Sequence, residues 1–259
     1  MKPPFDRVNV LGVGIDPLNL PSAVSVIGEA IRMRTKGYVC VTGVHGVSEA
    51  QDEPAFRAIL NRALLNTPDG MPMVWMGRWQ GRREMDRVYG PDLLLEVCRV
   101  SEQANWRHFF YGGAAGVAEQ LAAALQSRFP KLIVAGTHTP PFRPLNERET
   151  EELRALVTEK KPDIIWVGLS TPKQEAFMAG MISQLDTTLM IGVGAAFDLL
   201  SGRVRQAPRW IQRSGFEWLY RLVQEPGRLW KRYLKNNPLF IGRAFLQLTG
   251  LRRYTLEEK

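Results

Sequence analysis

Short apolar runs alternate along this chain with longer segments of helical spacing, and this alternation limits the folds that are open to it. The runs expected to form strands are Val8–Ile15, Tyr38–Thr42, His108–Tyr111, Leu132–Ala135, Ile164–Gly168 and Leu189–Val193. The segments expected to form helices lie near Ser22–Arg34, Val47–Arg62, Pro91–Gln103, Val117–Arg128, Glu147–Lys160 and Pro172–Gln184. Repeated strand–helix alternation is typical of parallel strands joined by right-handed crossovers. The sequence therefore predicts an α/β fold, a Rossmann-like α/β/α sandwich with a mainly parallel sheet.

The pattern changes after about Gly202. No further strand is expected there, and apolar residues recur close to helical spacing among many cations. Pro226 and Pro238 are expected to divide the region into short helices, because proline cannot donate the hydrogen bond of a helix interior. A chain of 259 residues has room for one large domain or two small ones. We predict a Rossmann-like catalytic domain over residues 1–202 and a basic, amphipathic helical appendage over residues 203–259.

The formal net charge of +8 is unevenly distributed. Between Ser201 and Arg253 there are 12 lysines and arginines but only 2 acidic residues. This asymmetry indicates an acidic partner surface, either nucleic acid or an anionic bilayer, although a solvated basic face would have the same composition. Helices that combine aromatic side chains with cations are typical of segments that lie in a membrane interface. The apolar stripe could instead pack on the sandwich and close the active site.

Neither a metal site nor a cofactor is expected. Cys40 and Cys98 belong to no CxxC motif, and His45, His108 and His138 lack the spacing of metal ligands. A complete GxGxxG or Walker loop and a GxSxG elbow are also missing. The apolar run near the N-terminus does not resemble a signal peptide, and no window reaches the roughly 18–20 apolar residues of a spanning helix. We therefore expect a protein of the reducing cytosol.

Asp69 is the candidate catalytic residue. It stands in the string Thr67-Pro68-Asp69-Gly70-Met71-Pro72, whose prolines and glycine indicate a tight loop. An aspartate in such a loop can serve only to bond nearby backbone amides. A carboxylate held on a rigid turn at the edge of a cleft can also take a proton from a hydroxyl, as a general base does. The residues alone leave both interpretations open.

Candidate binding residues stand near the expected strand ends and helix starts. Arg87 precedes an expected helix and can clamp a phosphate or carboxylate. Gly112-Gly113 follow a strand and lead into a helix, so backbone N–H groups and the positive helix end could meet a phosphate. Gln174, in the first turn of a helix, is expected either to point toward the strand-end cleft or to face solvent. His45, in the loop after Thr42, is a candidate pocket residue.

Several strings together resemble the WecG/TagA/CpsF family of bacterial glycosyltransferases (glycosyltransferase family twenty-six), over roughly Val8 to Arg232. They are TPDGMP at 67–72, RVYGPDL at 87–93, FYGG at 110–113, GLSTPKQE at 168–175, GVGAAFDLLSG at 192–202 and RQAPRWIQRSGFEWLYRLVQEP at 205–226. The last string is long enough that chance is a poor explanation.

The resemblance implies transfer of one sugar, with inversion and without a metal, from a UDP-sugar to a polyprenyl-diphosphate-linked sugar. It gives Asp69 the position of the catalytic base. Thr42, Arg87 and Gln174 match pocket positions, and Arg221 and Arg228 match appendage arginines that meet the diphosphate. The substrate-binding set expected from the motifs as a whole is Thr42, His45, Arg87, Gly112, Gly113, Gln174, Tyr220, Arg221 and Arg228. The resemblance also implies a peripheral location on the inner face of the cell membrane, reached through the appendage.

One departure from the family pattern concerns the donor sugar. Many members have Thr-x-Asn after the second strand, whereas Thr42-Gly43-Val44-His45 lacks that asparagine. The chain is more similar here to members that build exopolysaccharide. We therefore expect transfer of a hexose such as glucose in cell-surface or exopolysaccharide biosynthesis. Transfer of N-acetylmannosamine or of a uronic acid is the alternative.

Two other classes of function compete with an enzyme. A nucleic-acid-binding Rossmann protein could use the basic tail as its electrostatic footprint. The apolar seam of the tail argues against nucleic acid, because a phosphate-binding face does not need one. A membrane-associated scaffold without activity is the other class, and the presence of Asp69, Arg87 and Gln174 argues against it. The sequence does not determine an oligomeric state, and a homo-oligomer is compatible with it.

Overall fold

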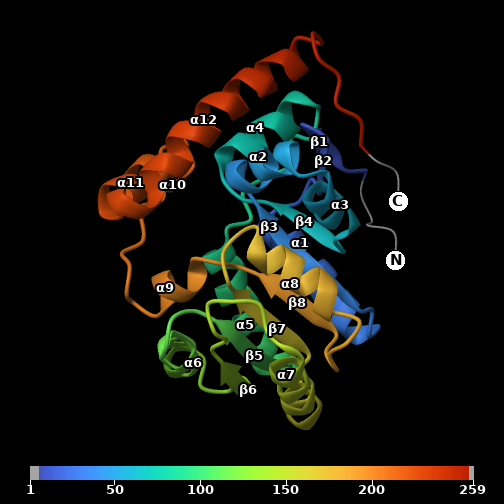
Figure 1. The fold of residues 1–259 in the computed structure, drawn as a ribbon, viewed down its shortest axis with the longest axis vertical. Helices are drawn as coiled ribbons and strands as arrows, with labels where there is room; N and C mark the ends of the chain where they lie inside the picture. Colours follow the sequence, from blue (N-terminus) through green and yellow to red (C-terminus); the bar gives the residue numbers. More distant parts are fainter. Residues whose placement is uncertain (1–5, 257–259) are drawn as a thin grey trace. The chain divides into compact units, whose positions relative to one another are not determined.

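The computed structural model describes residues 6–256, and the chain separates into two compact units (Figure 1). The first comprises Pro21–Cys40 and Gly90–Arg205. The second comprises the described residues of Lys2–Leu20, together with Val41–Tyr89 and Gln206–Lys259. Residues 206–256 thus belong to the same compact unit as residues 41–89, while the functional boundary expected at 202/203 stays a prediction.

A six-stranded sheet has the strand order β4-β3-β8-β7-β5-β6. Its strands are β3 (Gly37–Thr42), β4 (Leu65–Pro68), β5 (Arg107–Gly112), β6 (Ile133–His138), β7 (Ile164–Gly168) and β8 (Leu189–Gly192). The pairs β3–β8, β8–β7, β7–β5 and β5–β6 are all parallel. The boundary between the two units falls inside β3, after Cys40. These pairings confirm the predicted α/β class.

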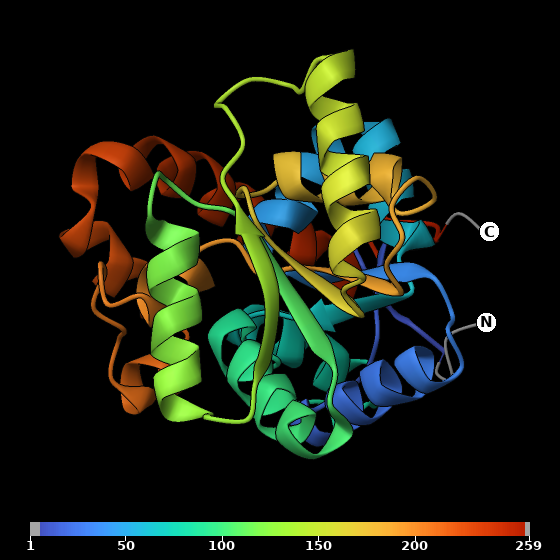
Figure 2. The same ribbon diagram turned by 90° about the horizontal axis from the view of Figure 1, so that it is seen from below.

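Helices cover both faces of the sheet in the first unit (Figure 2). One face carries α1 (Leu20–Arg32), α5 (Gly90–Ala104) and α6 (Val117–Arg128), and the other carries α7 (Glu147–Lys160) and α8 (Lys173–Met181). The chain moves outward from β5 to β6 through α6 and returns to β7 through α7. Right-handed crossovers that run in opposite directions lie on opposite faces, so the topology itself produces the predicted α/β/α sandwich. The short helix α9 (Ala196–Leu200) follows β8.

Large aromatic side chains fill the core of the first unit. Phe109, Phe110 and Trp166 project from the neighbouring strands β5 and β7 and are fully buried. His108 is buried with them, and its Nδ1 accepts a hydrogen bond of 2.9 Å from the indole Nε1 of Trp166. Burial lowers the pKa of His108 from 6.5 to about 3, since the charged imidazolium would lose its hydration. His108 is therefore a neutral structural residue.

The second unit is built around a small hairpin and a set of helices. Its elements are β1 (Val8–Val10), β2 (Val13–Ile15), β4, α2 (Val44–Asp52), α3 (Pro54–Arg62), α4 (Met71–Trp79), α10 (Arg209–Ser214), α11 (Glu217–Gln224) and α12 (Pro226–Leu248). The fully buried Asp16 ties β4 to this framework. Its carboxylate accepts hydrogen bonds from Arg7 Nε at 3.1 Å and from the backbone N–H of Asn66 at 2.7 Å. Because β4 leads directly into Asp69, this ion pair stabilises the strand that positions the candidate base.

The helix α12 has two apolar stripes. Leu229, Phe240 and Ala244, together with the polar Asn236, are buried on one side of α12, and α12 packs on α2 and α11. Trp230, Leu234, Ile241 and Phe245 follow one another at intervals of four and seven residues, which places them together on another side of the helix. All four are exposed. The predicted amphipathic character is therefore present, with both a packed and an uncovered apolar stripe.

Within residues 6–256, none of the helices combines the length and the apolar character that a membrane span requires.

Two elements expected to be continuous are interrupted. The run Val8–Ile15 is not one strand but the antiparallel hairpin β1–β2. Leu11 and Gly12 form its turn with φ of 52° and 83°, a backbone change that an apolar pattern does not reveal. The expected helix Val47–Arg62 is also wrong as a single element. It is broken at Glu53, whose extended backbone precedes Pro54, as is usual for a residue before proline.

The expectation at Pro238 is also wrong. Pro226 does begin a new helix, but Pro238 lies inside α12, which continues to Leu248. The buried side chains of Asn236 and Phe240 on either side hold this part of α12 against the unit, and such tertiary packing can outweigh the cost of one interior proline. Neither β4 nor α4, which flank Asp69, was expected from the sequence.

Candidate active site

Asp69 lies immediately after β4 on a closely constrained turn. Its backbone N–H donates a hydrogen bond of 2.9 Å to the carbonyl of Thr42, the last residue of β3. Gly43 gives this turn the space it needs, because a Cβ at position 43 would lie 3.0 Å from the Asp69 carbonyl oxygen and 3.5 Å from its Oδ2. Gly70 follows with φ of 87°, which favours glycine, and α4 then begins at Met71. The carboxylate is thus held at the carboxyl end of a strand, as predicted for a rigid turn.

The segment Arg87–Tyr89 runs alongside this turn. The backbone N–H of Val88 donates to the Pro68 carbonyl at 2.9 Å. The guanidinium carbon of Arg87 lies 3.8 Å from the centre of the Tyr89 ring, a cation–π contact. One Arg87 amino group donates to Gln212 Oε1 at 2.9 Å, and the other forms an ion pair with Glu217 in the first turn of α11. Arg87 therefore joins this segment to the C-terminal helices.

Partly buried charged residues surround Tyr89. The pKa of its hydroxyl is raised well above its ordinary value, first by burial and then by the negative charges of Glu217 and Asp69. Burial works against the charged form of Arg221, but Tyr233, Tyr89, Glu217 and Asp69 outweigh it and raise the pKa of Arg221. Tyr89 thus interacts with two cations, Arg87 and Arg221, and with two carboxylates, Glu217 and Asp69. We call Asp69, Arg87, Tyr89, Glu217 and Arg221 the Asp69 cluster.

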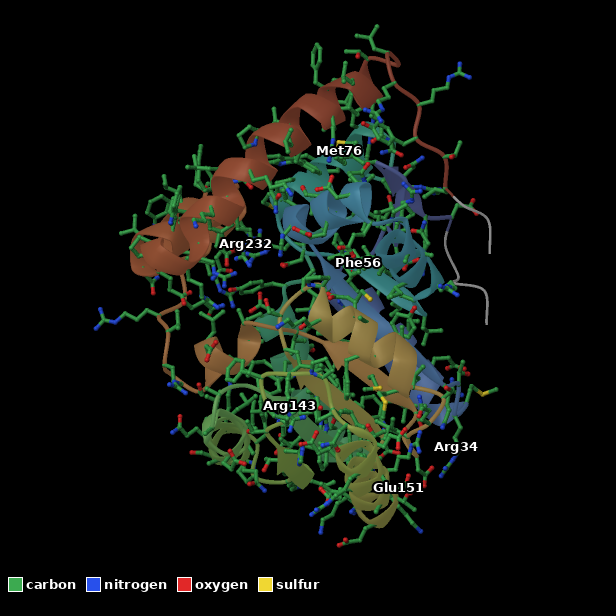
Figure 3. The ribbon with its side chains drawn as sticks, viewed as in Figure 1. Arg34, Phe56, Met76, Arg143, Glu151 and Arg232 are labelled. Atoms are coloured by element: carbon green, nitrogen blue, oxygen red, sulfur yellow. The ribbon has the colours of Figure 1, made fainter. Side chains whose placement is uncertain are left out.

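The predicted arginines and Tyr220 have different surroundings. Arg221 is half-buried on α11, and its Nε is buried without a hydrogen-bond partner among the described residues. Tyr220, its neighbour on α11, is also half-buried. Arg228, in the first turn of α12, is exposed and pairs with Glu225 at 2.5 Å. The structure thus includes Arg87 and Arg221 in the Asp69 cluster, whereas Arg228 pairs with the residue that precedes its own helix. Arg232, labelled in Figure 3, lies one turn further along α12.

Thr42 and His45 lie at the end of β3 and the start of α2. The Thr42 hydroxyl is buried without a hydrogen-bond partner among residues 6–256. His45 Nδ1 accepts a hydrogen bond from the amide of Asn236 on α12 at 2.9 Å, since an amide nitrogen can only donate. The same ring nitrogen lies 3.5 Å from Glu49 Oε1. The predicted pocket residue His45 is thereby joined to the C-terminal helix.

The other predicted residues belong to the first unit. Gln174 is in the first turn of α8 and is buried, so the solvent-facing alternative is wrong. A Cβ at Gly192 would lie 3.1 Å from its Nε2, and a Cβ at Gly194 would lie 3.3 Å from its Oε1. Gln174 therefore lies over the carboxyl end of β8. Its Nε2 donates to the buried carboxylate of Glu175 at 3.0 Å, and its Oε1 has no hydrogen-bond partner among the described residues.

Gly112 and Gly113 serve the packing of β5 against β7. A Cβ at Gly112 would lie 2.7 Å from the Gly168 carbonyl oxygen. The N–H of Gly113 donates to that same oxygen at 3.0 Å, so it already has a partner. The binding role expected for these two glycines stays a prediction, and the structure gives both a structural reason as well.

Sequence reasoning missed several residues of the two sites. Tyr89 and Glu217 stand inside quoted motifs, yet nothing in their spacing indicated that residues 128 positions apart would share one cluster. Gln212 and Asn236 were missed because a lone amide in a helix has no signature of function. Glu175 could have been found, since an acid in the first turn of a helix beside a strand end is a site for a buried carboxylate. Among residues 6–256, no three His, Cys, Asp or Glu side chains form a group that could hold a metal ion.

The chain belongs to the WecG/TagA/CpsF family of glycosyl transferases, whose model matches residues 8–254. Among its relatives, a Bacillus spizizenii protein named N-acetylglucosaminyldiphosphoundecaprenol N-acetyl-β-D-mannosaminyltransferase is 30% identical over 216 residues, which is 83% of this chain and 82% of the relative. A Bacillus subtilis protein of the same name is 29% identical, covering 83% of this chain and 85% of the relative. A Staphylococcus aureus protein with that name is 26% identical over 91% of both chains. The family expected from the motifs is confirmed. The relatives' names support the N-acetylmannosamine alternative better than the expected hexose.

Proposed function

We propose that this protein transfers N-acetylmannosamine from its UDP-activated form to N-acetylglucosamine carried on a polyprenyl diphosphate. Its family membership and the shared name of its relatives support this reaction. The single observation that carries it is the Asp69 cluster, in which a carboxylate at a strand end shares its surroundings with two guanidinium groups.

Asp69 acts as the general base. In an inverting transfer the acceptor hydroxyl oxygen attacks the anomeric carbon of the donor while the bond from that carbon to UDP breaks. The hydroxyl proton passes to the Asp69 carboxylate, and UDP leaves with the bonding electron pair. A well-placed base of this kind contributes roughly 10²–10⁴-fold to the rate. The turn formed by Thr42, Gly43 and Gly70 keeps the carboxylate in place for this step.

The arginines neutralise the leaving diphosphate. Negative charge develops on UDP as the bond breaks, and guanidinium groups bind phosphate oxygens with two parallel hydrogen bonds. Arg221 has an Nε without a partner in the described chain and lies in the same cluster as Asp69. Arg228 is exposed and can exchange Glu225 for a phosphate. We propose that both act without a metal.

The C-terminal helices attach the enzyme to the membrane that holds its acceptor. The uncovered stripe of Trp230, Leu234, Ile241 and Phe245 suits the interfacial region of a bilayer. The excess of lysine and arginine in this part of the chain suits anionic lipids, at about 1 kcal/mol for each cation near the surface. We propose a peripheral location on the inner face of the cell membrane, where a polyprenyl-linked acceptor is accessible.

A donor panel tests the reaction. The purified protein is incubated with polyprenyl-diphosphate N-acetylglucosamine and, separately, with UDP-N-acetylmannosamine, UDP-glucose and UDP-glucuronic acid. The lipid product is then weighed by mass spectrometry. The proposal predicts a product with UDP-N-acetylmannosamine and little with the other two donors. A product with UDP-glucose alone would contradict the proposal. It would support the hexose donor that is expected from the missing asparagine near His45.

A further inference from the structure

The helix α4 presents two exposed tryptophans that neither the core nor the chemistry at Asp69 uses. Trp75 is 50% exposed and Trp79 is 72% exposed. They stand four residues apart, so they lie on the same side of the helix. The buried residues of the helix pack into the unit; they are Met71, Met73, Val74, Gly77 and Met76, the last of which is labelled in Figure 3. Exposed tryptophans are enriched where a protein meets the headgroup region of a bilayer, because the ring is apolar and its N–H is polar.

These tryptophans adjoin the C-terminal helices. Gly215, in the turn between α10 and α11, lies directly against Trp75, since a Cβ at position 215 would be 2.5 Å from the ring atom Cη2. The next residue, Phe216, is 60% exposed. Trp75, Trp79 and Phe216 are therefore exposed aromatic side chains on adjoining segments, and we call them the α4 patch. The exposed Trp210 and Leu219 lie on the two helices that flank this turn.

Cations accompany the α4 patch. Arg78 lies between the two tryptophans in sequence, and Arg82 and Arg83 follow the helix. Arg213, on α10, is 76% exposed. Two acids face this group: Asp86 lies 3.8 Å from Arg78 and 3.9 Å from Arg213, and Asp6 lies 3.9 Å from Arg82. Arginine next to exposed tryptophan is complementary to lipid that carries phosphate and negative charge.

We propose that the α4 patch docks on an anionic bilayer together with the C-terminal helices. The inference rests on the proposed membrane attachment of residues 203–259 and adds a contact in a part of the chain that is remote in sequence. Trp75 and Trp79 enter the headgroup region, and the neighbouring arginines meet lipid phosphates. Two separate points of contact fix the orientation of the second unit on the surface.

Vesicle binding of the full chain tests the proposal. Vesicles of phosphatidylglycerol and phosphatidylcholine are sedimented with the wild type and with Trp79→Ala, which removes the more exposed ring and little packing. The expected result is about tenfold weaker binding, since most of one large apolar side chain returns to water. The matched control is Phe142→Ala, because Phe142 is a 92% exposed aromatic of the first unit. It is expected to bind as the wild type does. Equal melting temperatures would show that all three proteins are folded.

The outcomes separate this inference from the function proposed above. If Trp79→Ala and the wild type bind vesicles equally while Trp230→Ala binds more weakly, the α4 patch is not a lipid contact and the C-terminal attachment stands. If the wild type does not bind vesicles at all, both the attachment and the α4 patch are overturned. Trp79→Ala could instead dissociate an oligomer, measured by sedimentation velocity, with no change in vesicle binding. In that case the α4 patch binds a second copy of the chain and the lipid proposal is wrong.

Discussion

The carboxylate of Glu217 forms an ion pair with the guanidinium group of Arg87. The sequence motif predicts that this same guanidinium group binds a substrate phosphate. The side chains of Arg87 and Glu217 are only 8% and 15% exposed. Gln212 holds the other amino group of Arg87, and Tyr89 lies against its face. In this structure Arg87 therefore stabilises α11 against the strand end that carries Asp69. A phosphate that reaches Arg87 has to displace Glu217 or share the guanidinium with it.

Neutralising Glu217 should destabilise the protein. In Glu217→Gln, Arg87 keeps a hydrogen-bond acceptor but loses the buried opposite charge, so we expect the free energy of unfolding to fall by about 1–3 kcal/mol. Urea denaturation measures this change. The control is Glu225→Gln, which removes the partner of the exposed Arg228 and should cost less than about 1 kcal/mol. Equal effects at both sites would mean that the Arg87–Glu217 pair gains nothing from burial.

His108 should give the protein an acid-sensitive component of stability. Its folded pKa is about 3, against an ordinary value of 6.5, so between these values only the unfolded chain takes up the proton. The contribution of His108 is complete above pH 6.5 and falls by up to about 1.4 kcal/mol for each pH unit below it. Denaturation curves of the wild type and of His108→Gln, which keeps an acceptor for Trp166, isolate this slope. The difference between the two proteins should change over this range and be constant above pH 7. A constant difference throughout would show that His108 titrates normally.

Glu175 should act in the opposite direction. Burial raises the pKa of its carboxyl, although hydrogen bonds from Thr171 and Gln174 partly offset this effect. Its contribution to stability is therefore present below the ordinary pKa and is lost as the pH rises through the raised value. Compared with the wild type, Glu175→Gln should become relatively more stable as the pH rises from 4 to 8. Melting temperatures across that range measure the trend, and a trend of the opposite sign would contradict the raised pKa of Glu175.

Local sequence signals were sufficient for most of the sandwich. Val117–Arg128 and Glu147–Lys160 form helices with the predicted bounds, because their periodicity is uninterrupted and each is followed by a strand. These signals failed where the conformation of a few residues determines whether a strand or helix continues. The turn at Gly12 divides a continuous apolar run, and the packing of α12 keeps Pro238 inside a helix.

The candidate site was predictable only in part, for a different physical reason. Asp69 and Arg87 were identified because each stands in a short motif with an evident chemical use. Glu217, the ion-pair partner of Arg87, stands 130 residues away from it, and an ion pair over that separation depends on the whole fold. The α4 patch was missed because an apolar string does not show which of its side chains stay exposed; the ring of Trp75 is half exposed against Gly215.

The role of Asp69 as the general base is tested most directly by measuring the turnover of the Asp69→Asn variant. This substitution keeps the size and the backbone hydrogen bond to Thr42 but removes the proton acceptor. With UDP-N-acetylmannosamine and polyprenyl-diphosphate N-acetylglucosamine, we predict turnover at least about a hundredfold below the wild type, at an unchanged melting temperature. Turnover within a few-fold of the wild type would contradict the account, and would leave Asp69 as a residue that only shapes its turn.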